Sequence, residues 1–451
     1  MQTIMPAHGN TLKILGKGKD SADGYRLMTY VSVEKVDSGY LLFHTLTREL
    51  LLLTEEEYAD LYGIPALYEK WFIVPGTTDD MRLADKVRFI RRTVQKKPTH
   101  ITSYTILTTT DCNARCFYCY ELGRSRIPMR IETAHKAADY IVKNCGGEKV
   151  HLTWFGGEPL FHTQPIDIIC ADLREKNVEY RSTMITNGYL FDDDLVKRAV
   201  DAWKLRQVQI TLDGTEAVYN RCKAFIYRGG SPYQTVMANI QRLLAAEIGV
   251  SIRMNLDRHN ADDLFDLVEE LHDRFSGYKN LFAYSHVLFE FSGHHEKIRA
   301  AEERRELYRR QKLLTDRLKE YGLFASGSLK KSLPLTMCMA DSGISQMILP
   351  NGEIGLCETF TEDHFIGHLD TGVVDADMVK YFQMLREKEE RCSSCVCYPE
   401  CIRLQNCIEQ KRCFEEIQEE KIQALQASMR VTYQNWLNRT ETEEAQLVNV
   451  C

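Results

Sequence analysis

The segment that decides the fold runs from residue 103 to residue 119 and reads Ser103-Tyr-Thr-Ile-Leu-Thr-Thr-Thr-Asp-Cys112-Asn-Ala-Arg-Cys116-Phe-Tyr-Cys119. It begins with residues that favour a β-strand and ends with three cysteines spaced C-x3-C-x2-C. Three thiolates this close can hold one face of an iron–sulfur cube and leave one iron without a protein ligand. A zinc site, which needs a fourth ligand, and unrelated buried thiols are the alternatives.

Downstream of this segment, short β-rich runs alternate with amphipathic stretches of helical length. This order predicts parallel, right-handed β/α units with helices outside. Six units are too few for an eight-fold barrel, so we expect an α/β fold with a partial (β/α)6 barrel and its chemistry at the carboxyl ends of the strands. The strands are expected at Ser103–Leu107, Val150–Trp154, Ser182–Thr186, Gln207–Leu212, Ser251–Leu256 and Leu281–Leu288, and the helices at Ile131–Asn144, Ile166–Lys176, Asp192–Ala202, Tyr233–Glu247 and Asp262–Phe275.

Polar or glycine-bearing tips follow three of the expected strands. They read Gly156-Gly-Glu-Pro159, Thr186-Asn-Gly188 and Leu212-Asp-Gly214. Each alone is typical of a turn. All three, in order behind the cysteine trio, predict a ligand site at one edge of the sheet.

In these motifs, over residues 103–290, the chain resembles the radical S-adenosylmethionine (SAM) superfamily. The resemblance implies that Cys112, Cys116 and Cys119 hold a 4Fe–4S cluster whose open iron is chelated by SAM. It also implies that reductive cleavage of SAM gives a 5′-deoxyadenosyl radical. By the same resemblance, the remaining cofactor-binding residues are Tyr118, Gly156, Gly157, Glu158, Asn187 and Asp213: Tyr118 is the aromatic before the last cysteine, the Gly-Gly-Glu motif receives the SAM ammonium, and Asn187 and Asp213 contact the methionyl and ribose parts.

The carboxy-terminal cysteines form a pair and a dense group. Asn351-Gly352 predicts a hairpin turn that brings Cys338 and Cys357 together. With the dense group they resemble the SPASM extension, which implies two auxiliary 4Fe–4S clusters and three clusters in all. The family pattern would assign Cys392, Cys395, Cys401 and Cys413 to one cluster, and Cys338, Cys357 and Cys407 to the other.

Two departures from the family pattern keep this division open. Five residues separate Cys401 from Cys407, where the family commonly has three, and Cys397 is an additional thiol. A zinc-ribbon-like structural domain is the alternative for this region.

The chain is expected to divide into four parts. Residues 1–95 form a small α+β module with strands at Gly24–Val33 and Gly39–Leu53 and a helix capped by Thr54. This module weakly resembles leader-peptide recognition modules. Residues 96–290 form the partial barrel, 291–330 a helical linker, and 331–451 the cysteine-rich SPASM domain with a final helix at Phe414–Leu437.

Composition excludes several classes of function. The 451 residues carry 57 basic and 64 acidic side chains, a net charge of −7, which argues against a protein that coats nucleic acid. No apolar run is long enough to span a membrane, and the start lacks a secretory signal. Fifteen cysteines without an export signal favour a reducing, cytoplasmic setting and metal or catalytic use.

The resemblance therefore implies an oxidoreductase that acts on a ribosomally made precursor peptide with a leader, with a flavodoxin- or ferredoxin-type electron donor. Oxidative cross-linking, such as thioether formation at cysteine, is the expected reaction. A sulfatase-maturing enzyme, which makes formylglycine, is the alternative enzyme. The alternatives outside enzymes are an iron–sulfur electron carrier and a zinc-ribbon binding protein.

Overall fold

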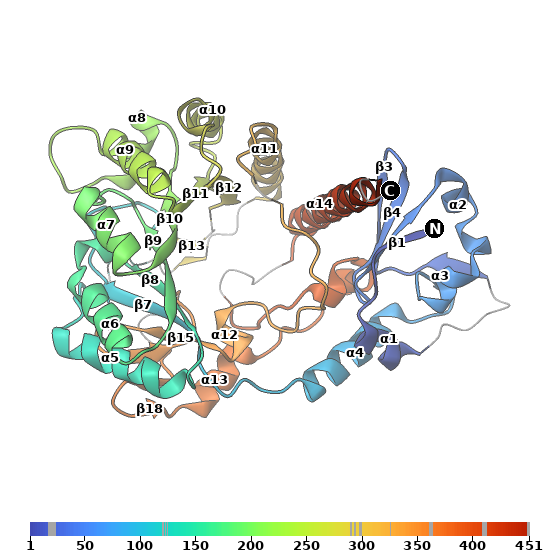
Figure 1. Cartoon of the computed structure of the whole chain (residues 1–451), viewed down its shortest axis with the longest axis horizontal. Helices are drawn as coiled ribbons and strands as arrows, with labels where there is room; N and C mark the ends of the chain where they lie inside the picture. The colour runs from blue at the N-terminus through green and yellow to red at the C-terminus, as the bar shows by residue number, and fades with distance from the viewer. Residues whose placement is uncertain are drawn as a thin grey trace.

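The computed structural model describes residues 1–16, 24–119, 121, 123, 125–288, 291–292, 295–296, 300–324, 326–359, 364–407 and 413–448. A barrel and an N-terminal module lie at opposite ends of the molecule, and the long helix α14 (Glu415–Val448) lies between them (Figure 1). In the described part of the chain, no helix combines the length and the apolar character needed to cross a membrane.

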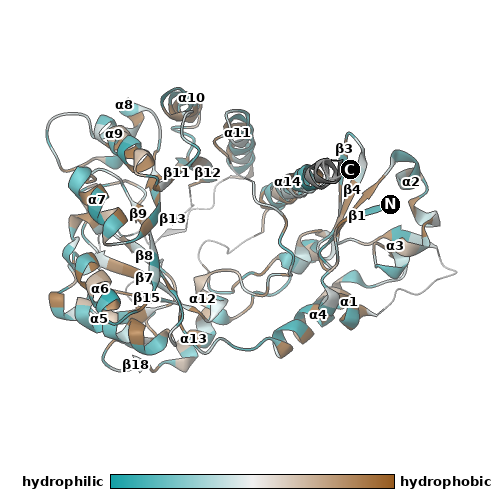
Figure 2. Ribbon diagram, viewed as in Figure 1, coloured by the Kyte–Doolittle hydropathy of each residue, from teal (hydrophilic) through white to brown (hydrophobic). Residues whose placement is uncertain are grey.

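Six parallel strands pair in chain order and form the predicted partial barrel. Helices cover their outer face, with apolar sides toward the sheet and polar sides outward (Figure 2). The fold class predicted from the sequence is confirmed, and the predicted strands and helices of the barrel agree with the structure to within a few residues. The strands are β7 (Ser103–Thr109), β8 (Val150–Gly156), β9 (Tyr180–Thr186), β10 (Leu205–Thr211), β11 (Gly249–Leu256) and β12 (Leu281–Val287), and the helices are α5 (Ile131–Asn144), α6 (Gln164–Glu175), α7 (Asp193–Asp201), α8 (Glu216–Lys223), α9 (Pro232–Ala245), α10 (Asp263–Phe275) and α11 (Ala301–Glu320).

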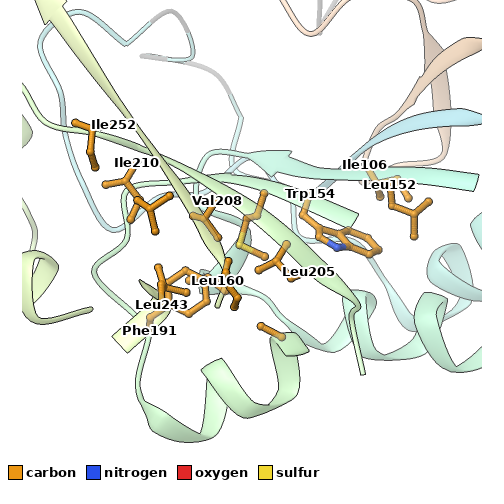
Figure 3. Packing of buried hydrophobic residues seen from close by; sticks show 14 of the residues in the cluster. Ile106, Leu152, Trp154, Leu160, Phe191, Leu205, Val208, Ile210, Leu243 and Ile252 are labelled. Atoms are coloured by element: carbon orange, nitrogen blue, oxygen red, sulfur yellow. The ribbon is translucent and has the colours of Figure 1, made fainter. Parts of the chain in front are cut away.

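Alternation along each strand separates an apolar core from a polar interior. On β8, Leu152 and Trp154 are fully buried and pack with the core beneath the helices (Figure 3). Their neighbours in the strand, His151 and Thr153, face the opposite side of the sheet. There the Thr183 hydroxyl lies 3.2 Å from Thr153 Oγ1 and 3.3 Å from His151 Nε2. The barrel therefore has a hydrogen-bonding inner surface, which suits a polar ligand.

The barrel sheet continues into the carboxy-terminal region. The predicted hairpin at Asn351-Gly352 is present, and its first strand pairs in parallel with β7. The sheet thus has ten strands, because β7 offers an open edge that the hairpin occupies. The added strands are β15 (Ser345–Ile348), β16 (Glu353–Gly355), β17 (Gly367–His368) and β18 (Gly372–Val373), and the nearby helices are α12 (Met339–Ser342) and α13 (Ala376–Gln383).

The N-terminal module contains a four-stranded antiparallel sheet in the order β1-β5-β4-β3. The predicted single strand Gly39–Leu53 is wrong: residues 45–48 form a turn that divides it into a hairpin, with Arg48 at φ 68°. The predicted strand Gly24–Val33 is likewise divided between two sheets. The elements are β1 (Gln2–Met5), α1 (Gly9–Leu15), β2 (Tyr25–Leu27), β3 (Val31–Val36), β4 (Gly39–His44), β5 (Glu49–Leu53), α2 (Glu55–Ala59), α3 (Pro65–Glu69), β6 (Ile73–Pro75) and α4 (Asp80–Val94).

The predicted cap at Thr54 is confirmed as a reciprocal pair of hydrogen bonds. Thr54 Oγ1 accepts from Glu57 N at 3.2 Å, and Glu57 Oε2 accepts from Thr54 N at 2.9 Å. Short elements complete the fold: β13 (Phe291–Ser292), β14 (His295–Glu296), and 3-10 turns at Leu61–Gly63, Pro159–Phe161, Glu390–Ser394 and Tyr398–Glu400.

Each face of the N-terminal sheet packs on a different part of the chain. One face, with Leu42 and Leu51, forms a core with Val87 of α4 and with Tyr398. The opposite face forms a core with apolar residues of α14 and with Cys397. The sheet is therefore covered on both sides, and the carboxy-terminal cysteine segment contributes to both cores.

Candidate functional site

The predicted cysteine loop follows β7 and is held by hydrogen bonds at both ends. Asp111 accepts a hydrogen bond from Cys112 N at 2.8 Å, and Cys119 N donates to Cys116 O at 3.1 Å. Between them, Arg115 N donates to the carbonyl of Lys223 at 2.8 Å. The three thiols line one cavity of about 290 Å³ at the carboxyl ends of the barrel strands.

Burial controls the protonation of two of these thiols. It raises the pKa of Cys112 to about 12 and that of Cys119 to about 11. Both are therefore protonated at neutral pH when no metal is bound. Metal binding replaces those protons, so an iron–sulfur cluster fits this donor set chemically.

Two glycines allow the loop after β8 to pack against the cysteine loop. A Cβ on Gly156 would lie 2.2 Å from Thr109 O, and one on Gly157 would lie 2.3 Å from Asp111 O. Gly157 N also donates to Thr109 O at 3.0 Å. Because they lack a Cβ, the two glycines allow the two chain segments to approach closely. Both also line the cavity of the three thiols.

Glu158 lies behind the glycines and is fully buried. Its carboxylate accepts hydrogen bonds from Leu160 N at 3.0 Å, Thr186 Oγ1 at 2.6 Å and Asn187 N at 2.8 Å. Burial raises the pKa of Glu158 to about 7, against the opposing effect of these hydrogen bonds. The carboxylate therefore joins the tips of β8 and β9.

Asn187 reaches the cysteine loop directly. Its Nδ2 donates to Asn113 Oδ1 at 2.6 Å and lies 3.9 Å from Cys112 Sγ, and its Oδ1 accepts from Tyr189 N at 3.0 Å. Asn187 lines the cavity of the three thiols. The structure thus brings together Asn187, the trio and the two glycines.

Tyr118 and Asp213 meet at a buried lysine. Tyr118 OH donates to Asp213 Oδ2 at 2.5 Å, and Lys223 Nζ lies 3.1 Å from the same carboxylate and 2.7 Å from the Tyr118 hydroxyl. Burial opposes the charge of Lys223, but Asp213, Tyr118 and Cys116 together raise its pKa well above the usual value. Burial also raises the pKa of Tyr118 well above its usual range.

A second cavity, of about 310 Å³, lies beside this triad and is lined by Tyr118, Asp213, Asn255 and Asn260. Asp213 is 1% exposed, and its Oδ1 has no hydrogen-bond partner among the described residues. A buried carboxylate oxygen is costly to leave unpaired, so this cavity suits a ligand with hydroxyl or N–H donors. Lys223 lines the first cavity. Its partners Tyr118 and Asp213 line the second, so the lysine stands between the two cavities.

Sequence reasoning missed Lys223. It lies in the last turn of α8, where a basic residue is ordinary because it complements the helix dipole. Nothing local distinguishes it from the exposed basic residues at other helix ends. Its role depends on β10 and the cysteine loop, which the fold brings to it.

The carboxy-terminal cysteines fall into two places. Four of them line a single cavity of about 520 Å³, together with Arg88 of α4 and Arg403: they are Cys392, Cys395, Cys401 and Cys413. Arg88 donates to the carbonyl of Cys401 at 3.3 Å, and Lys421 Nζ lies 3.6 Å from Cys401 Sγ. Cationic groups therefore surround a set of four potential thiolates.

The other three predicted ligands pack against the barrel core, and Cys338 interacts electrostatically with each of the other two; they are Cys338, Cys357 and Cys407. Burial raises the pKa of Cys338 to about 11 and that of Cys357 to about 12. Thus four of the seven cysteines line one cavity, and the other three lie against the barrel core.

Cys397 lies outside both groups. It is buried against Met429 and Phe43 in the core beneath α14. Its hydrogen bond to Cys395 is the main cause of a lowered pKa of the Cys395 thiol. Cys397 is therefore a structural neighbour of the four-cysteine cavity rather than part of its lining.

Among the described residues, no three His, Cys, Asp or Glu side chains converge closely enough to bind one metal ion.

Comparison with known proteins shows which family and which relatives the chain resembles. Residues 106–271 match the model of the radical SAM superfamily. The GTP 3′,8-cyclase of Clostridium perfringens is 30% identical over 169 residues, which is 36% of this chain and 49% of that protein. The probable GTP 3′,8-cyclase of Archaeoglobus fulgidus is 29% identical over 35% of this chain and 49% of its own length. The chain thus spans about half the length of these relatives.

Two solved structures share the fold over a longer range. Native anSMEcpe with bound AdoMet and Cp18Cys peptide has a TM-score of 0.55 at 15% identity, covering 75% of this chain and 99% of that one. Streptococcus suis SuiB bound to precursor peptide SuiA has a TM-score of 0.50 at 14% identity, covering 84% and 94%. At these identities the likeness concerns the fold.

Proposed function

We propose that this chain is a radical SAM enzyme that modifies a ribosomally made precursor peptide, since residues 106–271 match the model of the radical SAM superfamily. The observation that carries the proposal is the cavity in which three cysteines face Gly156 and Gly157 at the carboxyl ends of the barrel strands. The proposed reaction is oxidative cross-linking, such as thioether formation at a cysteine of the peptide.

The proposed cofactors are SAM and three 4Fe–4S clusters. Cys112, Cys116 and Cys119 would hold the cluster that binds SAM, and when bound the two supply a carbon-centred radical that abstracts hydrogen. The methionyl end would meet Gly156, Gly157 and Asn187, and the unpaired Asp213 Oδ1 offers an acceptor for the ribose hydroxyls. Glu158 would act through the loop it holds rather than by direct contact.

The two groups of carboxy-terminal cysteines support the auxiliary clusters. Each group is held by a different part of the fold, one beside α4 and one at the barrel edge. Clusters at these places could accept an electron from the substrate or bind a substrate thiolate. A flavodoxin- or ferredoxin-type protein would deliver the electron that starts the reaction.

A peptide substrate is supported by the two structures of like fold, which hold the Cp18Cys peptide and the precursor SuiA. We further propose that the N-terminal module recognises a leader by strand addition. Binding of the precursor should then slow hydrogen exchange at an edge strand of its sheet, β1 or β3. Unchanged exchange throughout the module would contradict leader recognition.

The test uses the reconstituted full chain under anaerobic conditions, with a candidate precursor peptide taken from any short reading frame that lies beside the gene. Thioether formation predicts loss of two hydrogens, retention of sulfur and loss of one alkylatable thiol, all by mass spectrometry. The triple variant Cys112→Ala/Cys116→Ala/Cys119→Ala should form no 5′-deoxyadenosine yet keep about eight of about twelve iron atoms. Cys145→Ala, at a buried core position outside the three groups and outside the lining of both barrel cavities, is the control.

Formylglycine formation is the second candidate, favoured by the 99% coverage of anSMEcpe. On a cysteine it replaces sulfur by a carbonyl oxygen and creates an aldehyde that reacts with hydrazides. A hydrazide-reactive, sulfur-free product would therefore overturn the thioether proposal.

Continued SAM cleavage by the triple variant would show that the radical site lies elsewhere.

A further inference from the structure

A groove of about 760 Å³ lies between the last barrel strand β12, the helix α11 that follows it, and α14. Figure 1 places α11 and α14 near one another, between the barrel and the N-terminal module. The volume lies in the range of about 300–1,000 Å³ that is typical of ligand sites. The groove is separate from both cavities beside the cysteine loop.

Two buried polar atoms in the groove lining lack partners within the described residues. Gln311 is 6% exposed; its Nε2 donates to Ser285 O at 3.0 Å and to Glu420 Oε1 at 3.2 Å, but its Oε1 is unpaired. Ser285 is 8% exposed, and its Oγ is also unpaired. Buried polar groups are normally satisfied. An amide N–H suits Gln311 Oε1, and either a donor or an acceptor suits Ser285 Oγ.

The walls of the groove carry opposite charges. The α11 wall has Arg305, Arg309, Lys312 and Lys319, with Asp316 as its acidic member, and the α14 wall has Glu416, Glu419 and Glu420. At one end Arg304 of α11 ties the helices together through Glu416 at 3.3 Å. A bound segment with side chains of both signs would therefore find a complementary wall on each side.

The groove also reaches the inner surface of the barrel. Tyr284 and His286 alternate with Ser285 along β12 and line the groove as well. The Tyr284 hydroxyl donates to Gln209 Oε1 of β10 at 2.9 Å. A segment lying in the groove would thus continue from the surface between the helices toward the polar barrel interior.

From this geometry we infer that the groove binds an extended segment of the peptide substrate, one that carries both acidic and basic side chains. The inference rests on the proposed peptide-modifying function and adds to it the place where the peptide enters. Peptide amides satisfy Gln311 and Ser285, and the charged side chains lie along α11 and α14. The reacting residue then follows into the barrel.

The test is a binding measurement on the reconstituted full chain with the same candidate precursor peptide, labelled with fluorescein. Ala424 of α14 is exposed and lines the groove, so Ala424→Phe fills it without removing a hydrogen bond. We expect at least a tenfold rise in Kd for this variant, measured by fluorescence anisotropy. Ala301→Phe, at an exposed position of α11 outside the lining, should keep the wild-type Kd.

A charge variant provides an independent measurement. Lys312→Glu, at an exposed lining position, should raise the Kd and reduce its dependence on salt, whereas Lys331→Glu, exposed outside the groove, should change neither. SAM cleavage without peptide should be unchanged in all four variants. Wild-type affinity in both Ala424→Phe and Lys312→Glu would overturn the groove as the peptide site.

The outcome is distinguishable from that of the proposed function. If the peptide gains a SAM-dependent mass change but the groove variants bind it normally, the groove inference is wrong and the function stands. If the peptide binds through the groove but its mass never changes, the groove stands and the proposed function is wrong. Failure of the peptide to bind the wild-type chain would overturn the groove inference by itself.

Discussion

Lys223 joins parts of the candidate site that are far apart in the sequence. Its ammonium contacts Tyr118 of the cysteine loop and Asp213 after β10, and its carbonyl accepts from Arg115. Both charged side chains of the Lys223–Asp213 pair are at least nine-tenths buried. A buried pair contributes little net stability, but removing one partner leaves an uncompensated charge.

Lys223→Met is therefore expected to lower the free energy of unfolding by roughly 3–5 kcal/mol, measured by urea denaturation. The double variant Lys223→Met/Asp213→Asn removes both charges and should recover much of that loss. Lys204→Met, at an exposed position, is the control. If the double variant is no more stable than Lys223→Met alone, the buried charge is not the cause of the loss.

At the scale of elements, the β4–β5 hairpin depends on a neutral histidine. His44 is fully buried, its Nε2 donates to Trp71 O at 3.1 Å, and its Nδ1 accepts from Leu46 N at 3.3 Å inside the turn. Burial lowers the pKa of His44 from 6.5 to about 3. The ring therefore keeps the tautomer that closes the turn.

Because the unfolded chain takes up this proton at higher pH than the folded one, stability is lost as pH falls from about 6.5 toward about 3. Lowering the pH from 7 to 5 should cost the wild type roughly 2 kcal/mol more than His44→Gln, which cannot titrate. Urea denaturation at the two pH values measures the difference. Equal slopes for His44→Gln and wild type would contradict the assignment.

At the scale of the whole molecule, the N-terminal sheet and the carboxy-terminal cysteine segment stabilise one another. Thr45 Oγ1 donates to Val396 O at 2.8 Å, and Arg48 forms an ion pair with Glu400 at 2.8 Å. Tyr398 OH donates to Asp85 of α4 at 2.6 Å. Segments more than 300 residues apart in sequence thus share a core and a cysteine-lined cavity.

Loss of cysteines from that cavity should therefore loosen the N-terminal sheet. In Cys392→Ser/Cys395→Ser, hydrogen exchange of β4 and β5 is expected to quicken, while β9 and β10 of the barrel keep their protection. Mass spectrometry of peptic fragments measures both regions in one experiment. Cys222→Ser is the control. Unchanged exchange in β4 and β5 would show that the cavity cysteines do not stabilise the N-terminal sheet.

The barrel was predictable because its signals are local. Apolar alternation and helical periodicity lie within single segments, so β7 to β12 and their helices agree with the predictions. The turn that divides Gly39–Leu53 was missed because Leu-rich residues continue on both sides of it. The joining of β15 to β7 was also missed, since strand pairing between distant segments leaves no local pattern.

The sequence by itself determined the chemistry that is available, because cysteine spacing and glycine-bearing strand tips are properties of short segments. Only the tertiary structure decided which groups meet. It placed Cys397 in a core, turned Glu158 toward the loop it holds, and buried Lys223 between Tyr118 and Asp213. The physical reason is that burial and partners depend on contacts between distant segments, and these contacts set the pKa and the role of each side chain.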